Sequence, residues 1–138
     1  MKTSEFQFSN PTLSELQFCI NDAYHTALKE ISVNLGINVA NKRISEREAT
    51  VELTLEIGEK NDMTPFYIRA VEGATFKWEE GAFAEEKEVE KFLGVNAPAL
   101  LLSYLRPIVS NVTMSSKYPG YNIPFINFND MNKKIDRA

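Results

Sequence analysis

The sequence predicts an α+β fold, in which a four-stranded antiparallel sheet carries helices on one face. Two observations lead to this prediction. Three segments in the first part of the chain alternate apolar with polar residues at a period of two, which is typical of strands that bury one face. The next segment changes to helical spacing, and a short aromatic run follows it. Strands that succeed one another before any helix favour antiparallel pairing between neighbours.

The first two strand patterns are predicted to form a hairpin. Apolar residues occupy every second position from Ile31 to Val39 and again from Ala49 to Ile57. Polar residues or glycine lie between them, so one face of each strand is expected to be buried and the other wet. The largely polar residues 42–46 suit the connection between the two strands.

The third strand pattern covers residues 66–78. Glu72 is the one exception to its apolar parity, and Gly73 beside it predicts a bulge or a close backbone approach. Upstream, residues 4–8 also alternate and end at the turn signal Ser9-Asn10-Pro11. Residues 13–20 carry apolar side chains on every second position at their end.

The chain then changes to helical patterns. Residues 85–93 are charged and helical in composition, and Gly94 is predicted to cap this helix. A second helix is predicted from Pro98, because the apolar residues Leu101, Leu105, Ile108 and Val112 follow at helical spacing. It is expected to cover the dry face of the sheet. The aromatic run 121–128 predicts a last strand, and Pro124 within it indicates an edge position or a bulge.

Size and composition indicate a single domain, residues 1–138. A net charge of −4 predicts no general attraction to nucleic acid. The longest apolar run, Ala97 to Leu102, is too short to cross a bilayer, so no membrane insertion is expected. Residues 1–8 show no signal-peptide pattern, and the lone Cys19 suits a reducing compartment. The protein is therefore predicted to be cytoplasmic.

No constellation for catalysis and no cofactor motif is found in the sequence. His25 is the only histidine and Cys19 the only cysteine, which excludes a zinc site. The carboxylates of residues 85–90 follow the pattern of a solvated helix face, and Glu52 and Glu56 are expected on the wet face of the second strand. Those two either form an acidic docking patch or are simply solvated. We predict that the protein is not an enzyme and uses no metal or cofactor.

Aromatic residues are numerous, with nine Phe, five Tyr and one Trp. Phe66 and Tyr67 are neighbours in a strand, so their side chains point to opposite faces. Tyr67 is therefore either covered by another subunit or a loop, or exposed with its hydroxyl in water. Both interpretations stay open.

Two segments in the second half of the chain carry specific motifs. In residues 96–106 a proline, Pro98, is followed six residues later by Tyr-x-Arg. Residues 119–128 have the pattern Pro-x-x-Asn-Ile-x-x-Ile-Asn-Phe. The first segment resembles the helix signature of the SecB family of export chaperones, and the second meets that family's closing pattern at every fixed position. Phe8-Ser9-Asn10-Pro11 and Gly73-Ala74-Thr75-Phe76 are similar to two upstream segments of the family, so the resemblance covers about residues 4–131.

The resemblance implies an ATP-independent holdase that binds unfolded polypeptides. It implies assembly as a homotetramer, a dimer of dimers formed partly through the helix. Clients are expected in a groove between the helix side of the sheet and a crossover loop, placed here at Pro11 to Ile20. Arg106 is expected to make a structural ion pair or an interface contact. The residues expected to contact clients are Leu16, Phe18, Phe66, Phe76, Trp78 and Leu101.

Partner docking on the sheet face is expected to involve Glu5, Tyr67, Glu52 and Glu56. Proteobacterial members of the family dock the translocase motor SecA through carboxylates on the outer sheet face and near the N-terminus. Ser9 and Arg69 occupy two of those positions here, and the acidic C-terminal tail is replaced by a basic one, so SecA docking is not favoured. Two alternatives stay open: a chaperone dedicated to the antitoxin of a toxin–antitoxin pair, and an interaction module that has lost general client binding.

Overall fold

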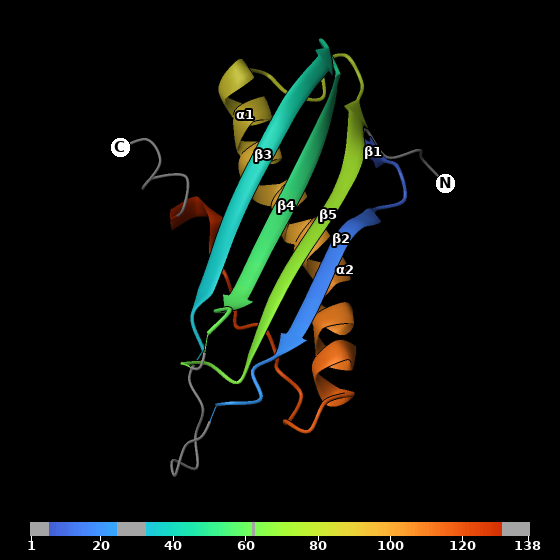
Figure 1. Ribbon diagram of the computed structural model, residues 1–138. Helices are drawn as coiled ribbons and strands as arrows, with labels where there is room; N and C mark the ends of the chain where they lie inside the picture. Colours follow the sequence, from blue (N-terminus) through green and yellow to red (C-terminus); the bar gives the residue numbers. More distant parts are fainter. Residues whose placement is uncertain (1–5, 25–32, 62, 131–138) are drawn as a thin grey trace.

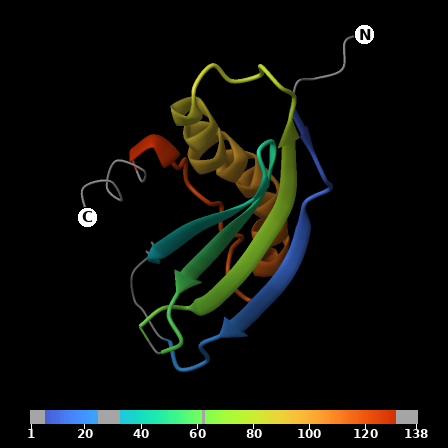
Figure 2. The same cartoon turned by 90° about the horizontal axis from the view of Figure 1, so that it is seen from above.

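The computed structural model describes residues 6–24, 33–61 and 63–130, which form one antiparallel sheet and one long helical run packed against it (Figure 1, Figure 2). The strands are β1 (Phe6–Phe8), β2 (Thr12–Ile20), β3 (Leu35–Ser45), β4 (Glu48–Gly58) and β5 (Phe66–Trp78). The helical run comprises α1 (Glu86–Lys91), the π-helical turn η1 (Phe92–Asn96) and α2 (Ala97–Met114). We refer to the side of the sheet on which α2 packs as the helix side, and to the other as the outer side.

The strands occupy four positions in the sheet, in the order β1/β2, β5, β4, β3. β1 and β2 pair with the same edge of β5, since Phe6 lies opposite Trp78 and Ile20 lies opposite Phe66. The break between them contains Pro11, which has no N–H to donate to the ladder. The predicted α+β fold is confirmed, and the sheet has five strands because its first edge strand is in two pieces.

The hairpin between β3 and β4 is tighter than predicted. Ser45 already pairs with Glu48, so residues 42–45 belong to β3 and not to a loop. Charged and polar side chains are common on edge strands, where they point into solvent without disturbing the backbone ladder.

The bulge predicted at Gly73 lies on the neighbouring strand instead. The register between β4 and β5 is unbroken, whereas β2 shifts its register against β5 between Leu13 and Glu15. Gly73 does mark a close backbone approach, because a Cβ atom there would lie 3.3 Å from the carbonyl oxygen of Val51.

The prediction that Gly94 ends a helix is wrong. The helical run continues through the π-helical turn η1 into α2. Leu93 and Ala97 on either side of this glycine are both buried, at 2% and 1% exposure. Their burial outweighs the helix penalty of glycine, which is about 1 kcal/mol, and a π-helical turn adjusts the phase so that both face the core.

The last strand predicted at 121–128 is also wrong. This segment is an extended arm that lies on α2 without joining the sheet. The Arg106 guanidinium donates hydrogen bonds to the carbonyl groups of Ile123 and, at 3.1 Å, of Pro124. Within the described residues, Arg106 therefore makes backbone hydrogen bonds, where an ion pair or an interface contact was predicted. Pro124 lacks the N–H that a ladder needs, which favours an arm over a strand.

The crossover loop, placed at Pro11 to Ile20 by the resemblance, lies elsewhere. Residues 12–20 form β2, whose backbone pairs with β5. The chain crosses from this edge of the sheet to β3 at the opposite edge through residues 21–34, of which 25–32, with His25, lie outside the described residues.

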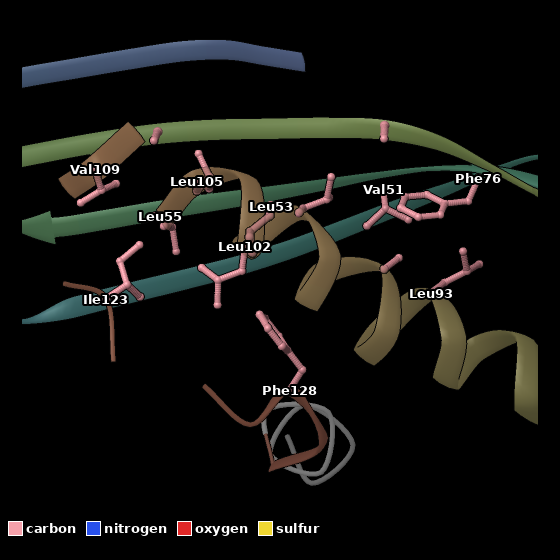
Figure 3. Packing of buried hydrophobic residues seen from close by; sticks show 14 of the residues in the cluster. Val51, Leu53, Leu55, Phe76, Leu93, Leu102, Leu105, Val109, Ile123 and Phe128 are labelled. Atoms are coloured by element: carbon pink, nitrogen blue, oxygen red, sulfur yellow. The ribbon is translucent and has the colours of Figure 1, made fainter. Parts of the chain in front are cut away.

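The core lies between the helix side of β4 and β5 and the inner face of α2 (Figure 3). Leu101, Leu105 and Val109 on α2 are fully buried, and Ile123 and Phe128 of the arm close the core from the side. The helical run Glu86–Met114 is long and apolar enough to span a membrane by length and composition. Its apolar stripe is nonetheless the part that packs on the sheet.

Candidate functional site

A strip of partly exposed apolar side chains lies along one edge of the sheet. Phe6, Phe8, Leu13 and Leu16, which we name the edge strip, are 37%, 46%, 38% and 39% exposed. They lie opposite Trp78, Phe76, Glu72 and Ala70 of β5. Residues opposite each other in a ladder share a face, so the edge strip lies on the helix side.

The width of the two layers explains why the edge strip is open. The outermost of four strands about 4.8 Å apart are separated by about 14 Å, whereas one α-helix with its side chains is about 10 Å wide. α2 packs over β4 and β5, so β1 and β2 extend beyond it. A single helix therefore cannot bury the apolar side of the edge strand.

Aromatic clusters lie at both ends of the edge strip. At the β1 end, the ring of Phe6 lies 5.2 Å from that of Phe83 and 5.2 Å from that of Phe92. At the β2 end, the ring of Phe66 lies 6.1 Å from Phe18 and 6.2 Å from Tyr121. These rings offer large apolar contact area with few rotatable bonds.

A pocket of about 230 Å³ adjoins the aromatic cluster at the β2 end. Burial raises the pKa of Tyr121, one of the residues that line it, so this phenol stays neutral at physiological pH. The pocket is lined by Val33, Pro65, Phe66, Tyr118, Pro119, Gly120 and Tyr121.

The structure separates the six predicted client contacts into two groups. Leu16 is exposed and Phe18 half-buried, so both can be reached from solvent. The other four are buried in the described chain: Phe66 at 4%, Phe76 at 2%, Trp78 at 7% and Leu101 at 0% exposure. For these four, contact with a client stays a prediction.

The exposed members Phe6, Phe8 and Leu13 were not among the predicted contacts. The alternation in residues 4–8 was a signal for the first two, because it places both phenylalanines on one face. Leu13 could not be found in this way, since the bulge between Leu13 and Glu15 breaks the period that marks residues 16–20.

On the outer side, Tyr67 and Glu56, two of the residues predicted to dock a partner, form part of an ion network. Glu52 and Glu56 are exposed, and Tyr67, only 8% exposed, donates a hydrogen bond of 3.1 Å to the Glu56 carboxylate. Burial is the main cause that raises the pKa of Tyr67, and the hydrogen bond to the Glu56 carboxylate is the next. Glu5 lies outside the described residues.

Arg69 occupies the centre of this network. Its guanidinium lies 2.8 Å from Glu15 and 2.9 Å from Glu56, and thereby joins β2, β5 and β4. The Glu15 carboxylate is the main cause that raises the pKa of Arg69. Glu56 is thus paired within the chain, which leaves Glu52 as the more available carboxylate of the two.

The described titratable side chains do not gather into a metal site. In the described part of the chain, no group of three or more His, Cys, Asp or Glu side chains is placed to hold a metal ion. Cys19 is a free thiol, exposed on β2.

The fold and the edge strip define a class of protein: an α+β domain that presents an open apolar surface beside its helix. Residues 5–137 match the family described as preprotein translocase subunit SecB. The chain therefore belongs to the SecB family, whose members are chaperones and not enzymes.

Two relatives are similar to this chain in sequence, and one solved structure is similar to it in fold. The protein-export protein SecB of Alcanivorax borkumensis is 29% identical over 89% of this chain and 80% of its own length. Protein MJ0357 of Methanocaldococcus jannaschii is 26% identical over 96% of this chain and 85% of its own length. Among solved structures, the SecB-like chaperone Rv1957 of Mycobacterium tuberculosis, in complex with a ChAD peptide from the Rv1956 HigA1 antitoxin, shares the fold. It has a TM-score of 0.71 and 14% identity, and the match covers 88% of this chain and 91% of that one.

Proposed function

We propose that this protein is an ATP-independent holdase that binds unfolded polypeptides along the edge strip. The observation that carries the proposal is the open row of four large apolar side chains on the helix side of the sheet. Burial of apolar surface contributes about 25 cal/mol per Å², so an extended segment laid on the strip gains affinity without a defined sequence. The aromatic clusters at its ends extend the surface that a client can cover.

The opposite edge of the sheet supports the same function through the backbone. The Gly58 N–H donates to the Asn34 carbonyl at 2.9 Å, and hydrogen-bonded pairs alternate along an antiparallel ladder. The N–H and C=O groups of Leu35, Ile37 and Val39 therefore point away from β4, where no described strand pairs with them. Main-chain hydrogen bonds to an added strand do not depend on client sequence, which suits a general chaperone.

We propose that a second copy of the chain packs against the outward face of α2. Arg106 is the one charged residue of this helix, and it bonds to the arm. Tyr104 and Met114 on the outward face are 41% and 62% exposed. An uncharged helix face of this kind favours self-association, in line with the dimer of dimers that the family resemblance implies. We place this assembly in the cytoplasm.

The edge strip is tested by following light scattering while a chemically unfolded model protein is diluted into buffer without ATP. The protein is expected to suppress aggregation at a near-stoichiometric ratio, and Leu16→Asp is expected to lose most of this effect. Ile44→Asp is the matched control, since Ile44 is 54% exposed but lies at the far end of β3. Equal loss in both variants, or in neither, would remove the edge strip from client binding.

A dedicated client is the second candidate function. The observation in its favour is the shared fold of the SecB-like chaperone that was solved with an antitoxin peptide. A dedicated chaperone would bind one partner encoded nearby far more tightly than unfolded model proteins. Failure to suppress aggregation, combined with tight binding to such a partner, would favour this candidate.

A further inference from the structure

Glu72 is a carboxylate on the apolar side of the sheet. Its side chain is 2% exposed, and no donor in the described residues reaches its Oε2 atom. In the ladder it lies between Leu53 of β4 and Leu13 of β2. Leu53 is fully buried and Leu13 is 38% exposed, so Glu72 lies between the core and the open edge strip.

Among the described residues, the elements around Glu72 offer it no compensating charge. On the helix side, β4 presents Ala49, Val51, Leu53, Leu55 and Ile57, and the described residues of β1 and β2 present the edge strip with Phe18 and Ile20. The titratable or charged groups of α2 are Tyr104 and Arg106, and Arg106 bonds to the arm. Glu15, Glu52 and Glu56 lie on the outer side. Arg43 also faces the helix side, but it pairs with Glu86.

Desolvation disfavours the ionised form of a carboxyl group, and burial accordingly raises the pKa of Glu72. Leu13 and Leu16 beside it still contact water, which moderates this cost in the free protein. A client segment that covers the edge strip removes this water and adds no charge. The free energy of the ionised carboxylate then rises further, while that of the neutral acid changes little.

We propose that Glu72 takes up a proton when an apolar client segment covers the edge strip, so that client affinity increases as the pH falls. The inference rests on the proposed function and adds a regulation of that same site. When binding is linked to the uptake of one proton, the binding constant changes by up to tenfold per pH unit. This change occurs between the pKa values of the linked group in the free and the bound protein. The edge strip is thus expected to hold clients more tightly in a mildly acidic medium and release them more readily as the pH rises.

The test uses the whole protein and an end-capped apolar peptide without ionisable side chains. Isothermal calorimetry in buffers of different ionisation enthalpy counts the protons taken up on binding, over about three pH units above the ordinary glutamate pKa of about 4.3. The wild-type protein is expected to take up as much as one proton per peptide. Glu72→Gln, which keeps the shape of the side chain, is expected to take up none and to bind with no pH dependence. Glu52→Gln, on the outer side of β4, is the matched control and is expected to behave like wild type.

Binding of the peptide without proton uptake by wild type, or with undiminished uptake by Glu72→Gln, would overturn this inference and leave the holdase function intact. The same holds if a lysine in the middle of the peptide strengthens binding to wild type and abolishes the uptake, because Glu72 would then act as an ionised partner for a cation. Absence of peptide binding by both proteins at every pH would overturn the proposed function itself and the inference with it.

Discussion

Replacement of Arg106 by methionine is expected to loosen the C-terminal arm from α2. The guanidinium donates to two backbone carbonyl groups, of Ile123 and Pro124, and these bonds hold the arm on the helix. Methionine keeps the apolar stem of the side chain and removes both bonds. The loss of stability therefore reflects the two hydrogen bonds and not a change in packing. The arm carries Ile123 and Phe128 into the core at 4% and 3% exposure.

The expected loss in the free energy of unfolding follows from how far each of the two bonds is shielded from water. A hydrogen bond from a charged donor contributes about 1.5–3 kcal/mol when it is shielded from water. The bond to Ile123 is partly buried and the bond to Pro124 is exposed. We therefore expect the free energy of unfolding to fall by about 2 kcal/mol, nearly all of it from the partly buried bond.

Urea denaturation at constant protein concentration measures this change, with the fluorescence of Trp78, the only tryptophan, as the signal. Arg47→Met is the matched control. Arg47 pairs with Glu46 at 3.9 Å and its side chain is 48% exposed, so its replacement is expected to change stability by less than about 0.5 kcal/mol. Arg106→Lys is expected to fall between the two, because an ammonium lacks the planar fork that reaches two carbonyl groups. Equal stability of Arg106→Met and Arg47→Met would refute the reasoning.

Three further variants test the core, the outer side and the buried carboxyl. Leu101→Asp is expected to abolish folding or assembly, since it buries an unpaired charge at a fully buried position; a soluble oligomer of unchanged size in light scattering would contradict this. Arg69→Met is expected to lower the free energy of unfolding in low salt and to recover it in high salt, because Glu15 and Glu56 lose their shared cation; a salt response equal to wild type in urea denaturation would show that the network is not stabilising. The pKa of Glu72 is raised in the folded state, so the folded protein binds the proton more tightly than the unfolded chain. Wild-type stability should therefore decrease as the pH rises from the ordinary glutamate pKa through the raised value, and Glu72→Gln should lack this decrease; parallel pH curves would contradict it.

The strands β3, β4 and β5 were predictable because their signal is local. A strand with one buried face repeats every two residues, and β4 shows this period from Ala49 to Ile57 with each apolar residue at 1% exposure or less. The same period in β5 placed Glu72 on the apolar side, where the structure finds it buried. Glu72 appeared in the sequence as an exception to the apolar pattern, and it is the residue that we propose takes up a proton on client binding.

The wrong predictions share a physical cause. The helix end at Gly94 was predicted from a local preference worth about 1 kcal/mol, and the strand at 121–128 was predicted from its aromatic composition. Their outcome was decided by contacts distant in sequence: burial of Leu93 and Ala97 on the sheet, and hydrogen bonds from Arg106 to the arm. Tertiary contacts of this size override the local signal. The prediction that residues 1–138 form a single domain is a matter of chain length and stays a prediction.

The edge strip could not be found from a local pattern, because it is open only as a result of the layer geometry. Leu16 and Ile57 both follow a period of two, yet one is 39% exposed and the other fully buried. The difference is their distance from the single helix that covers the sheet. Only the strand order and the position of α2 separate an apolar residue that builds the core from one that stays exposed at the edge.

The two sides of the sheet are consequently suited to different partners. On the outer side, Arg69 already satisfies Glu15 and Glu56, so a basic partner that docks there must compete with a cation held at 2.8 and 2.9 Å. On the helix side, the side chains of the edge strip are 37–46% exposed, so this apolar area is available without breaking an ion pair. An extended apolar polypeptide therefore loses less on binding to the helix side than a charged partner does on the outer side. This difference follows from one residue, since an acidic or neutral side chain in place of Arg69 would leave both carboxylates free to attract a basic partner.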